Sequence, residues 1–436
     1  MKTVVVGAGL SGLTLAERIL SSGTGEQVTV LEREDTPGGL ARSFRIDGFD
    51  FDIGPHRFHT FNTEVDSYLL EILADCFVQI SRRSSVHMAG KYRNWPLTPT
   101  SVAGLPFPVL WKSFLDLFNK PDIPVINSFA DFIRSRYGDN LYNFFFSGYT
   151  RKFTGIDAEM LHVDWAQAGV NRAVIDNRVK ADSLLSLVKG MLLPQPVETK
   201  FYYPACGGIQ TFCNLQCERI EALGGKLLLS TPVKGLSIEN NSVSGIVLEN
   251  GESIPADRVF WTAPITILYP ETGLTFINTL IANVALADEI PRNDYQWCYF
   301  GHEDLIFSRL TVPRNFRADC VPPGKGSVIA EITCDSDSEF WKNPETIRER
   351  LINNLKSVRA VAGDDILFIN WQRIRETYPV YTLDYKEKLS SIHIPNGLFL
   401  TGRCGSFWYN NMDHSIAQSL SIVQGSEFKK DFWNER

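Results

Sequence analysis

The sequence predicts an α/β protein in which a strand–turn–helix domain is interrupted by a helical insertion and by a mixed antiparallel sheet. Three observations predict this fold class. The N-terminus runs from a β-branched strand into a helix, apolar residues recur at helical spacing in residues 128–146, and strand-like runs follow one another between residues 270 and 390. At 436 residues the chain is too long for one ordinary core, so we expect about two or three packed units.

Composition excludes several classes of protein. The chain is 44% hydrophobic and 21% charged, with a net charge of −7, which argues against a protein that coats nucleic acid or an anionic membrane. No run of about 18 apolar residues exists, so we expect no membrane span. The N-terminus lacks the features of a signal peptide. The eight cysteines are scattered without paired spacing, which predicts reduced thiols, a cytoplasmic protein and no metal site.

The first element is the stretch "TVVVGAGLSGLTLAERIL" at residues 3–20. Gly7, Gly9 and Gly12 follow a strand and open a helix, and Glu32 ends the next strand about 20 residues later. Glycines let the backbone approach a pyrophosphate, the helix start offers free N–H groups, and the carboxylate accepts ribose hydroxyls. We therefore expect dinucleotide binding in a Rossmann-like domain, with Leu10 and Ser11 in the binding turn.

The next stretch, "EREDTPGGLARSF" at residues 32–44, carries a second glycine pair. Taken alone, the pair could be a surface turn that needs glycine for its backbone angles. After a ribose-binding acid, it resembles the flavin adenine dinucleotide (FAD) proteins of the amine oxidase superfamily. The resemblance implies an FAD-binding domain of the GR2/amine oxidase type, and it adds these expected cofactor contacts: Arg33, Gly38, Gly39, Leu40, Ala41 and Arg42.

The insertions are predicted from local patterns. Helices should dominate residues 100–195, with Ser128 as an N-cap. Strands are expected at "TLIANVALA", "QWCYFG", "GSVIAEITC" and "ILFINWQRI", beside a helix at "NPETIRERLINNLKSV". The last helix should extend to about Phe432.

A segment from residue 203 to 265 resembles the part of the superfamily's fold that completes the flavin domain, with Val233 beside the adenine. The flavin domain should therefore be discontinuous. We predict FAD-binding parts at 1–75, 203–265 and 390–436, a helical substrate and nucleotide domain at 76–202, and an antiparallel sheet substrate domain at 266–389.

Four further stretches resemble UDP-galactopyranose mutases and their relatives. They are "GRCGSFWYNNMDHS" (402–415), "DIGPHRFHT" (52–60), "YNFFFSGYTRKFTGIDAEML" (142–161) and "YPVY" (378–381). Arg403 stands where flavin oxidases of the superfamily usually have an acidic residue. The resemblance implies an isomerase that interconverts pyranose and furanose forms of a nucleotide-diphosphate sugar through an adduct of the sugar with N5 of the reduced flavin.

The resemblance also implies roles for individual residues. Asp413 would cap the last helix and direct its positive end toward the flavin. Further cofactor contacts would be His56, Arg57, Phe58, His59, Gly402, Arg403, Asn411, Met412, Asp413 and Ser415. Catalytic residues would be His56, Arg172, Tyr378, Tyr409 and Asn411, with Arg178 and Arg373 as reserve arginines. Substrate-binding residues would be Phe145, Tyr149, Phe153, Arg172, Tyr381 and Tyr409. His414 is expected to be a surface residue at the helix start.

Alternatives stay open at this level. Thr154 stands where bacterial mutases have a tryptophan against the uracil, so the nucleobase is undetermined. An FAD-dependent oxidoreductase of the amine oxidase or protoporphyrinogen oxidase type, acting on an amine, a porphyrin-like or a polyprenyl substrate, is the second hypothesis. A flavin-carrying binding protein is the third. No second dinucleotide motif is visible, so a reductant such as NAD(P)H would bind transiently; a homodimer is an open expectation.

Overall fold

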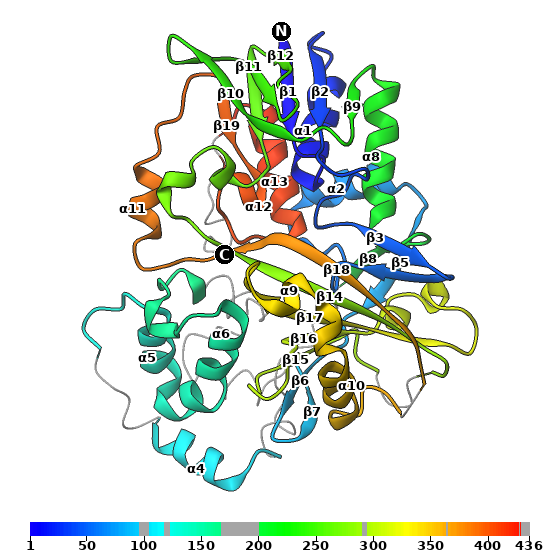
Figure 1. The fold of residues 1–436 in the computed structure, drawn as a ribbon, viewed down its shortest axis with the longest axis vertical. Coiled ribbons are helices and arrows are strands. Elements are labelled where there is room, and N and C mark those ends of the chain that lie inside the picture. The colour runs from blue at the N-terminus through cyan, green and yellow to red at the C-terminus, as the bar shows by residue number, and fades with distance from the viewer. Residues whose placement is uncertain are drawn as a thin grey trace.

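The computed structural model describes residues 1–95, 104–116, 123–166, 200–289, 294–362, 365–426 and 428. Figure 1 shows the N-terminal parallel sheet in the upper part of the molecule, a larger sheet below it, and helices α4–α6 beside that larger sheet. The predicted fold class is confirmed. Within the described residues, no helix is long and apolar enough to cross a membrane.

The parallel sheet has five strands in the order β19-β13-β1-β2-β9. These strands are β1 (Lys2–Val6), β2 (Gln27–Leu31), β9 (Lys226–Leu228), β13 (Arg258–Trp261) and β19 (Leu398–Leu400). All four neighbouring pairs are parallel. Three distant segments of the chain thus supply one sheet, which is the arrangement that a discontinuous domain requires; the domain boundaries themselves stay a prediction.

Four helices pack around this sheet. They are α1 (Leu10–Ser21), α2 (Thr63–Leu73), α8 (Gln210–Ala222) and α13 (Met412–Val423). Helix α1 contacts both α8 and α13, and its apolar residues such as Leu13 and Leu15 are fully buried. Helix α1 is therefore buried on several sides, which explains why apolar residues occupy most of its positions. A small antiparallel sheet of β10 (Val233–Glu239), β11 (Ser242–Leu248) and β12 (Ser253–Pro255) packs nearby.

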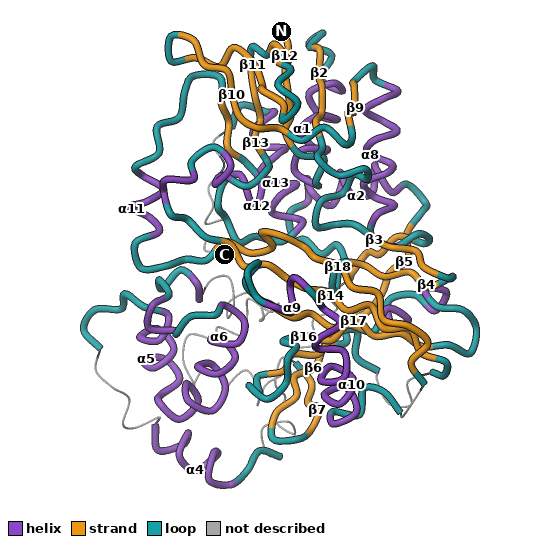
Figure 2. The backbone as a smooth tube through the Cα atoms, viewed as in Figure 1, coloured by secondary structure: helices purple, strands orange, loops and turns teal. Residues whose placement is uncertain are grey.

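The second large sheet has seven strands in the order β18-β14-β17-β16-β15-β6-β7. Figure 2 shows strands of this sheet, such as β18, β14 and β17, in orange below the parallel sheet. They are β6 (Ser84–Met88), β7 (Lys91–Asn94), β14 (Phe276–Leu286), β15 (Trp297–Phe300), β16 (Arg309–Thr311), β17 (Gly326–Cys334) and β18 (Ile366–Pro379). Every pair is antiparallel except β15 with β6. The four predicted strand runs lie in β14, β15, β17 and β18, and the predicted helix is α10 (Arg348–Ser357).

The insertion expected to be helical begins with three strands that its local pattern did not predict, β5 (Phe77–Ser81), β6 and β7. Strand β5 pairs with β8 (Lys200–Pro204), and β6 pairs with β15, more than 200 residues away. Short strands with polar residues such as Ser84, Ser85 and His87 carry little local signal, and distant partners stabilise them. A hairpin of β3 (Ser43–Ile46) and β4 (Phe49–Asp52) completes this region.

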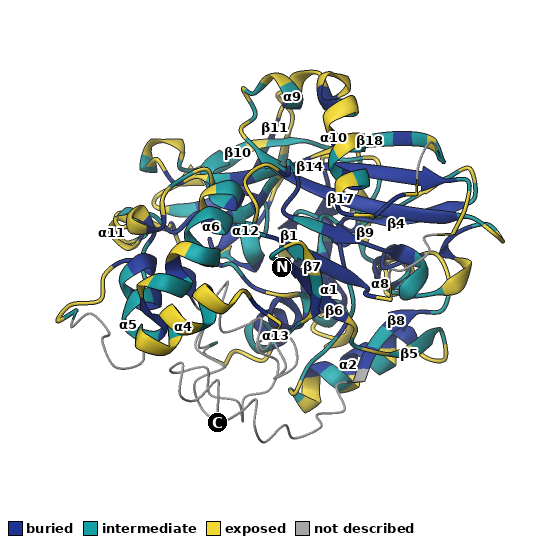
Figure 3. Cartoon of the chain, turned by 90° about the horizontal axis from the view of Figure 1, so that it is seen from below, coloured by how far each residue is buried: buried dark blue, intermediate teal, exposed yellow. Residues whose placement is uncertain are grey.

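Helices form the rest of the insertion. They are α4 (Phe107–Asp116), α5 (Phe129–Leu141), a π-helical turn (Tyr142–Phe146) and α6 (Ser147–Thr154). The predicted cap of α5 is confirmed, because Ser128 Oγ accepts from the N–H of Asp131 at 3.1 Å while the Asp131 carboxylate accepts from the N–H of Ser128 at 3.0 Å. Figure 3 shows mostly buried strands at the centre and exposed residues on helices such as α4 and α11 (Tyr385–Ser390).

The C-terminal helix is shorter than predicted. Helix α13 ends at Val423, and Gly425 then adopts a positive φ of 69°. Positive φ at a glycine is a common way to end a helix, so α13 stops before Gly425. Residue 432 itself lies outside the described residues.

Candidate functional site

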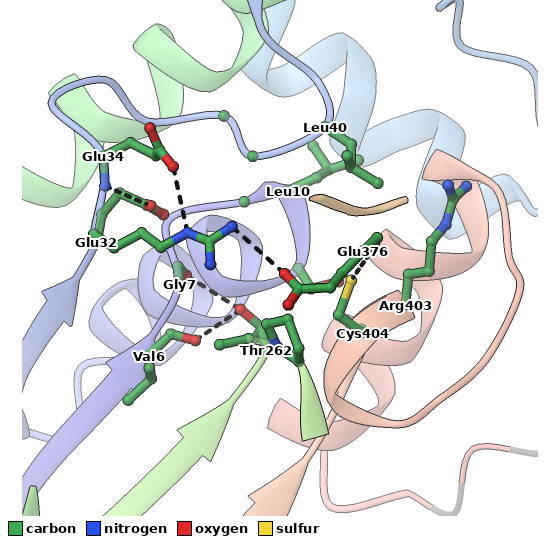
Figure 4. Close-up of a pocket in the computed structure, with 18 of the residues that line it drawn as sticks. Val6, Gly7, Leu10, Glu32, Glu34, Leu40, Thr262, Glu376, Arg403 and Cys404 are labelled. Carbon is green, nitrogen blue, oxygen red and sulfur yellow. Dashed lines mark hydrogen bonds and ion pairs between the residues drawn. The ribbon is translucent and has the colours of Figure 1, made fainter. Parts of the chain in front are cut away.

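A cavity of about 510 Å³ lies where the carboxyl ends of the parallel strands meet β18 of the large sheet. This is the edge at which parallel α/β sheets bind ligands. Figure 4 shows Glu32 and Glu34 on one side of the cavity, Thr262 beside Gly7, and Arg403 with Cys404 on the other side. Predicted cofactor residues that line it are Gly7, Gly9, Leu10, Ser11, Glu32, Arg33, Gly38, Gly39, Leu40, Ala41, Arg42, His56, Val233, Gly402, Arg403, Asn411, Met412 and Ser415.

The two glycine motifs pack against each other at one wall. Gly7 has a φ of +101°, a conformation that disfavours any side chain. A Cβ on Gly39 would stand 3.1 Å from the Cα of Gly9. Gly9 is the N-cap of α1 and has no side chain to satisfy the first N–H groups, so the helix start is available to an anion in the cavity.

Gly12 does not line the cavity, because it serves the packing of α1 on β1. A Cβ at Gly12 would overlap the carbonyl oxygen of Gly7. We expect Gly12→Ala to lower the free energy of unfolding by more than about 2 kcal/mol and to weaken flavin retention. Urea unfolding with flavin fluorescence checks this. Gly235→Ala is the matched control, since a Cβ there meets nothing within 4 Å, and it should stay within about 1 kcal/mol of the parent. Equal behaviour of both variants would contradict the packing role.

Glu32 is held in place by the turns around it. Its Oε2 accepts from the N–H of Ala8 at 2.7 Å, and its Oε1 accepts from the N–H of Glu34 at 3.1 Å. The side chain is 7% exposed, so the carboxylate faces the cavity and not bulk solvent. Each carboxylate oxygen has further lone pairs, which suits acceptance of two ribose hydroxyls.

Two ion pairs lie at the rim of the cavity. Arg33 lies 3.6 Å from Glu376 of β18 and so joins the rim to the large sheet, and Arg42 lies 3.6 Å from Glu34 within the rim itself. Glu376 itself has a positive φ of 54°, and its N–H donates to Asn278 at 3.0 Å. Glu376 was missed from the sequence, because nothing in its local pattern shows that β18 crosses the cavity.

The C-terminal loop is anchored by Arg403 in the short helix α12 (Gly402–Gly405). Its guanidinium donates to the carbonyl oxygens of Thr377, at 3.1 Å, and Asn410. The guanidinium also lies 5.2 Å from the ring centre of Tyr378 and 5.5 Å from that of Tyr409. Arg403 therefore joins β18 to the loop and reaches the cavity and two tyrosines at once.

Two expectations at the last helix are wrong. The N-cap of α13 is Asn411, not Asp413, and Asn411 also lines the cavity. His414 is 2% exposed and therefore not a surface residue. Its Nδ1 accepts from the N–H of Asn411 at 3.1 Å. Asp413 is buried and lies away from the cavity lining. The positive end of α13 still faces the cavity through Asn411 and Met412.

Arg57, Phe58 and His59 do not line the cavity either. Phe58 is fully buried in the core, with its ring 4.6 Å from that of Phe212. Arg57 stacks over Trp297 at 4.4 Å. Of the predicted loop, His56 alone lines the cavity.

His56 is surrounded by cations. Burial lowers the pKa of its imidazole to about 3, with Arg403, Arg309 and Arg57 adding to the effect. Its buried Nδ1 has no hydrogen-bond partner among the described residues. His56 is therefore neutral at physiological pH, which removes it as a general acid there and leaves it as a neutral polar contact.

The His56 shift predicts acid sensitivity. Because the folded-state pKa lies below the ordinary value near 6.5, the unfolded chain binds one more proton between these values. The contribution to stability is full above about pH 6.5 and is lost as pH falls toward 3. We expect the urea concentration at the unfolding midpoint to fall less between pH 7 and pH 4.5 in His56→Gln than in the parent protein. An equal fall of the midpoint in both proteins would show that His56 has an ordinary pKa.

Next to the cavity lies a group of rings that we call the aromatic cluster, which consists of Phe145, Tyr149, Phe153, Trp165, Tyr299, Tyr378, Tyr381 and Tyr409. Phe145, Tyr149 and Phe153 stack along one side of the π-helical turn and α6, with centroids 5.7 and 5.9 Å apart. Phe153 then meets Tyr378 at 5.1 Å, and Tyr378 meets Tyr409 at 4.9 Å. The structure thus brings together predicted residues from three distant stretches of the chain.

Two tyrosines of the cluster, Tyr381 and Tyr149, are enclosed by neighbouring groups. Tyr381 is 6% exposed, and its hydroxyl accepts from the N–H of Tyr409 at 2.7 Å. The ring centre of Tyr149 lies 6.4 Å from that of Tyr299, and burial raises the pKa of Tyr149 well above the ordinary value. Arg172 and Arg178 lie outside the described residues, and Arg373 is on the cavity rim with its guanidinium donating to the carbonyl oxygens of Trp341 and Lys342.

Sequence reasoning missed a buried ion pair under the cluster. Arg309 of β16 donates twice to Glu331 of β17, both times at 2.5 Å, and once to the hydroxyl of Tyr378 at 3.2 Å. Glu331 holds the pKa of Arg309 well above the ordinary value against the opposing effect of burial. Glu331 also packs against Gly54, where a Cβ would stand 3.0 Å from its Oε1. Arg309 and Glu331 are directly opposite in the register of β16 and β17, so their side chains face the same side of the sheet. The alternation of side chains along each strand was the sequence feature that could have indicated this pair.

The fold and the cavity define a class of protein, the dinucleotide-binding proteins with a Rossmann-like domain. The polar groups of the cavity fit a dinucleotide. The uncapped start of α1 can donate N–H groups to a diphosphate, and the fixed carboxylate of Glu32 can accept from ribose hydroxyls. Residues 10–296, about two thirds of the chain, match the family described as flavin containing amine oxidoreductase. The chain belongs to that family, which implies a flavin cofactor, and the predicted resemblance to this superfamily is confirmed.

Curated relatives match only short segments. Phytoene dehydrogenase of Streptomyces griseus is 56% identical over 52 residues, which is 12% of this chain and 10% of that protein. A 4,4'-diapophytoene desaturase of Staphylococcus aureus (strain COL) is 46% identical over 55 residues, which is 13% of this chain and 11% of that protein. The chain thus spans about a tenth of the length of these relatives.

Solved structures match nearly the whole chain at low identity. A reduced UDP-galactopyranose mutase superposes with a TM-score of 0.83 at 21% identity, covering 97% of this chain and 94% of that one. A putative protoporphyrinogen oxidase from Exiguobacterium sp. 255-15 gives 0.75 at 17% identity, covering 97% and 98%. A putrescine oxidase gives 0.67 at 15% identity, covering 97% and 98%. At these identities the likeness is one of fold.

Proposed function

We propose that this chain is an FAD-dependent nucleotide-sugar mutase, active with reduced flavin, that interconverts the pyranose and furanose forms of a sugar linked to a nucleoside diphosphate. One observation carries the proposal: Arg309 and Arg403 both contact the tyrosines of the aromatic cluster, and Arg403 also lines the cavity. Six of the eight rings in the cluster, all except Trp165 and Tyr299, come from the stretches that resemble mutases, and the similar fold of a UDP-galactopyranose mutase supports the assignment.

The residues suit a leaving diphosphate. Guanidinium groups stabilise charge as it develops on phosphate oxygens, most strongly where water is excluded. Tyr378 accepts from Arg309, so its own hydroxyl proton is left to donate to a substrate oxygen. Stacked rings offer a surface for a nucleobase, and Tyr149 and Phe153, both predicted substrate-binding residues, stack with their centroids 5.9 Å apart.

A reduced flavin in the cavity would supply a nucleophilic ring nitrogen for the anomeric carbon of the sugar. The chain's own part is to keep the cofactor in place and to favour the anionic reduced ring. The positive end of α13 and the cation of Arg403 both act in that direction. Arg172 stays a prediction as a further diphosphate contact, and so do the external reductant, for which NAD(P)H is the proposal, and a homodimer.

A second candidate is an FAD-dependent oxidoreductase. The family match and the short matches to phytoene and diapophytoene enzymes favour it. An apolar substrate would use the rings of the aromatic cluster. Arg309 is already paired with Glu331, but the cation of Arg403, whose contacts among the described residues are carbonyl oxygens and rings, would have no anionic partner there. Electrostatic complementarity therefore favours the nucleotide sugar.

The test is anaerobic incubation of dithionite-reduced protein with UDP-, GDP- and TDP-sugars, followed by chromatographic separation of isomers. We expect an isomer of equal mass only with reduced flavin, and a loss of turnover in Tyr409→Phe with flavin still bound. No isomer from any sugar, together with flavin reduction by an amine, a porphyrinogen or a polyprenyl compound, would replace the mutase with the oxidoreductase.

A further inference from the structure

Two cysteines that the proposed function does not use meet at the end of a strand pair. Cys76 precedes β5, and Cys206 follows β8, its antiparallel partner. The Sγ atoms lie 3.7 Å apart, which is the one sulfur–sulfur contact among the described residues. The N–H of Ala205 donates to the carbonyl oxygen of Cys76 at 3.1 Å, so the two backbones are already fixed side by side.

Both thiols can be reached by a small oxidant. Cys206 is exposed and Cys76 is partly exposed, whereas Cys213, Cys217, Cys298 and Cys320 are buried. Burial, followed by the contact with Cys206, raises the pKa of the Cys76 thiol. Cys206, the more exposed of the two, is therefore the first to react, and Cys76 is positioned to resolve the product.

The segment after Cys206 leads straight to the cofactor cavity. The Thr211 hydroxyl donates to the carbonyl oxygen of Cys206 at 2.6 Å. Gln210 then donates to the carbonyl oxygen of Pro37 at 2.8 Å and accepts from the N–H of Ser43 at 3.3 Å. Pro37 and Ser43 flank the glycine loop that lines the cavity. A covalent tie at Cys206 would therefore restrain the helix start that supports this loop.

We infer that Cys76 and Cys206 form a reversible dithiol–disulfide couple whose oxidised state slows the loss of flavin from the cavity. The inference rests on the flavin of the family and not on the mutase activity. The oxidant is a low-molecular-weight disulfide such as oxidised glutathione. The Cys206 thiolate attacks it and releases one glutathione thiolate. The Cys76 thiolate then attacks the mixed disulfide and releases the second, so the protein loses two electrons and two protons while the oxidant is reduced to two thiols.

The tie should resist opening of this region. Joining residues that are distant in sequence disfavours the opened state more than the closed one. The geometry is favourable, since the two Sγ atoms already lie 3.7 Å apart and need only approach to the bond length of about 2.0 Å. Reduction by dithiothreitol should reverse the effect completely.

The experiment treats the flavin-loaded protein with oxidised glutathione and maps its peptides without reduction. We expect a linked peptide that contains Cys76 and Cys206, with a mass lower by two hydrogen atoms than the sum of the free peptides. Flavin release in mild urea, followed by fluorescence, should be on the order of ten-fold slower in the oxidised protein. Dithiothreitol should restore the original rate.

Variants separate the alternatives. Cys76→Ser should carry glutathione on Cys206 without the link, and its flavin release should not slow. Cys213→Ser is the control with a buried thiol, and it should still form the link. Absence of the linked peptide in the parent protein would overturn the inference. A linked peptide with flavin release equal to that of the reduced protein would overturn the connection to the cavity.

Discussion

Replacing Arg309 by methionine is expected to lower the free energy of unfolding by about 3 kcal/mol and to abolish turnover. The side chains of Arg309 and Glu331 are 19% and 5% exposed, so the substitution leaves a buried carboxylate without its cation. The hydroxyl of Tyr378 loses its donor in the same step. Chemical unfolding gives the first effect, and the nucleotide-sugar isomer assay gives the second.

The double variant Arg309→Met with Glu331→Met separates the two effects. Removing both charges should recover most of the stability, because no unpaired charge remains, while turnover stays lost. Arg348→Met is the matched control, since its pair with Glu345 is exposed and should contribute at most about 1 kcal/mol. Normal turnover in the double variant would show that Arg309 has no part at the substrate.

Replacing Arg403 by alanine is expected to weaken flavin binding and to lower turnover by about two to three orders of magnitude. The substitution removes donors to the carbonyl oxygens of Thr377 and Asn410, and with them the link between β18 and the loop before α13. The cation over Tyr378 and Tyr409 is lost as well. Flavin titration by fluorescence and the reduction potential of the bound flavin measure both roles.

The variant Arg403→Lys separates the effect of the positive charge from the effect of the hydrogen-bond geometry of the guanidinium. Lysine keeps the cation but lacks the planar fork that serves two carbonyl oxygens at once. We expect the reduction potential to stay close to that of the parent, while turnover falls because Tyr409 is less well placed. Arg348→Ala should leave both quantities unchanged. Unaltered flavin binding and potential in Arg403→Ala would assign the loop anchor to other residues.

Most of the residues that the local sequence assigned to a cofactor line one cavity. The turn at Gly7 and Gly9 needs glycine for reasons that lie within a few residues, and Glu32 follows at a fixed distance in the same unit. The strands β14, β17 and β18 were also predicted from local sequence, because long runs rich in apolar and β-branched residues favour strands. Errors arose at element ends, where Asn411 and not Asp413 caps α13 and where the helix ends at Val423. They also arose in the strands β5, β6 and β7, because β5 and β6 pair with strands that are distant in sequence.

The second glycine motif shows where local reading runs out. Residues 38 and 39 could be recognised as a turn, but the close approach of Gly39 to Gly9 needed the fold. Likewise Phe58 and His59 stood inside a motif that resembles a cofactor loop, although Phe58 is buried in the core. A motif identifies a segment, whereas the direction of each side chain depends on what packs against it.

The sequence by itself determined the α/β class, the dinucleotide-binding turn and the chemical kinds of residue at the proposed substrate site. Only the tertiary structure decided that Arg309 pairs with Glu331, that Arg33 reaches Glu376, and that Cys76 meets Cys206. The physical reason is the range of the interactions. Turns and apolar periodicity act between residues that are close in sequence, whereas ion pairs, ring contacts and thiol pairs depend on which distant strands become neighbours in a sheet.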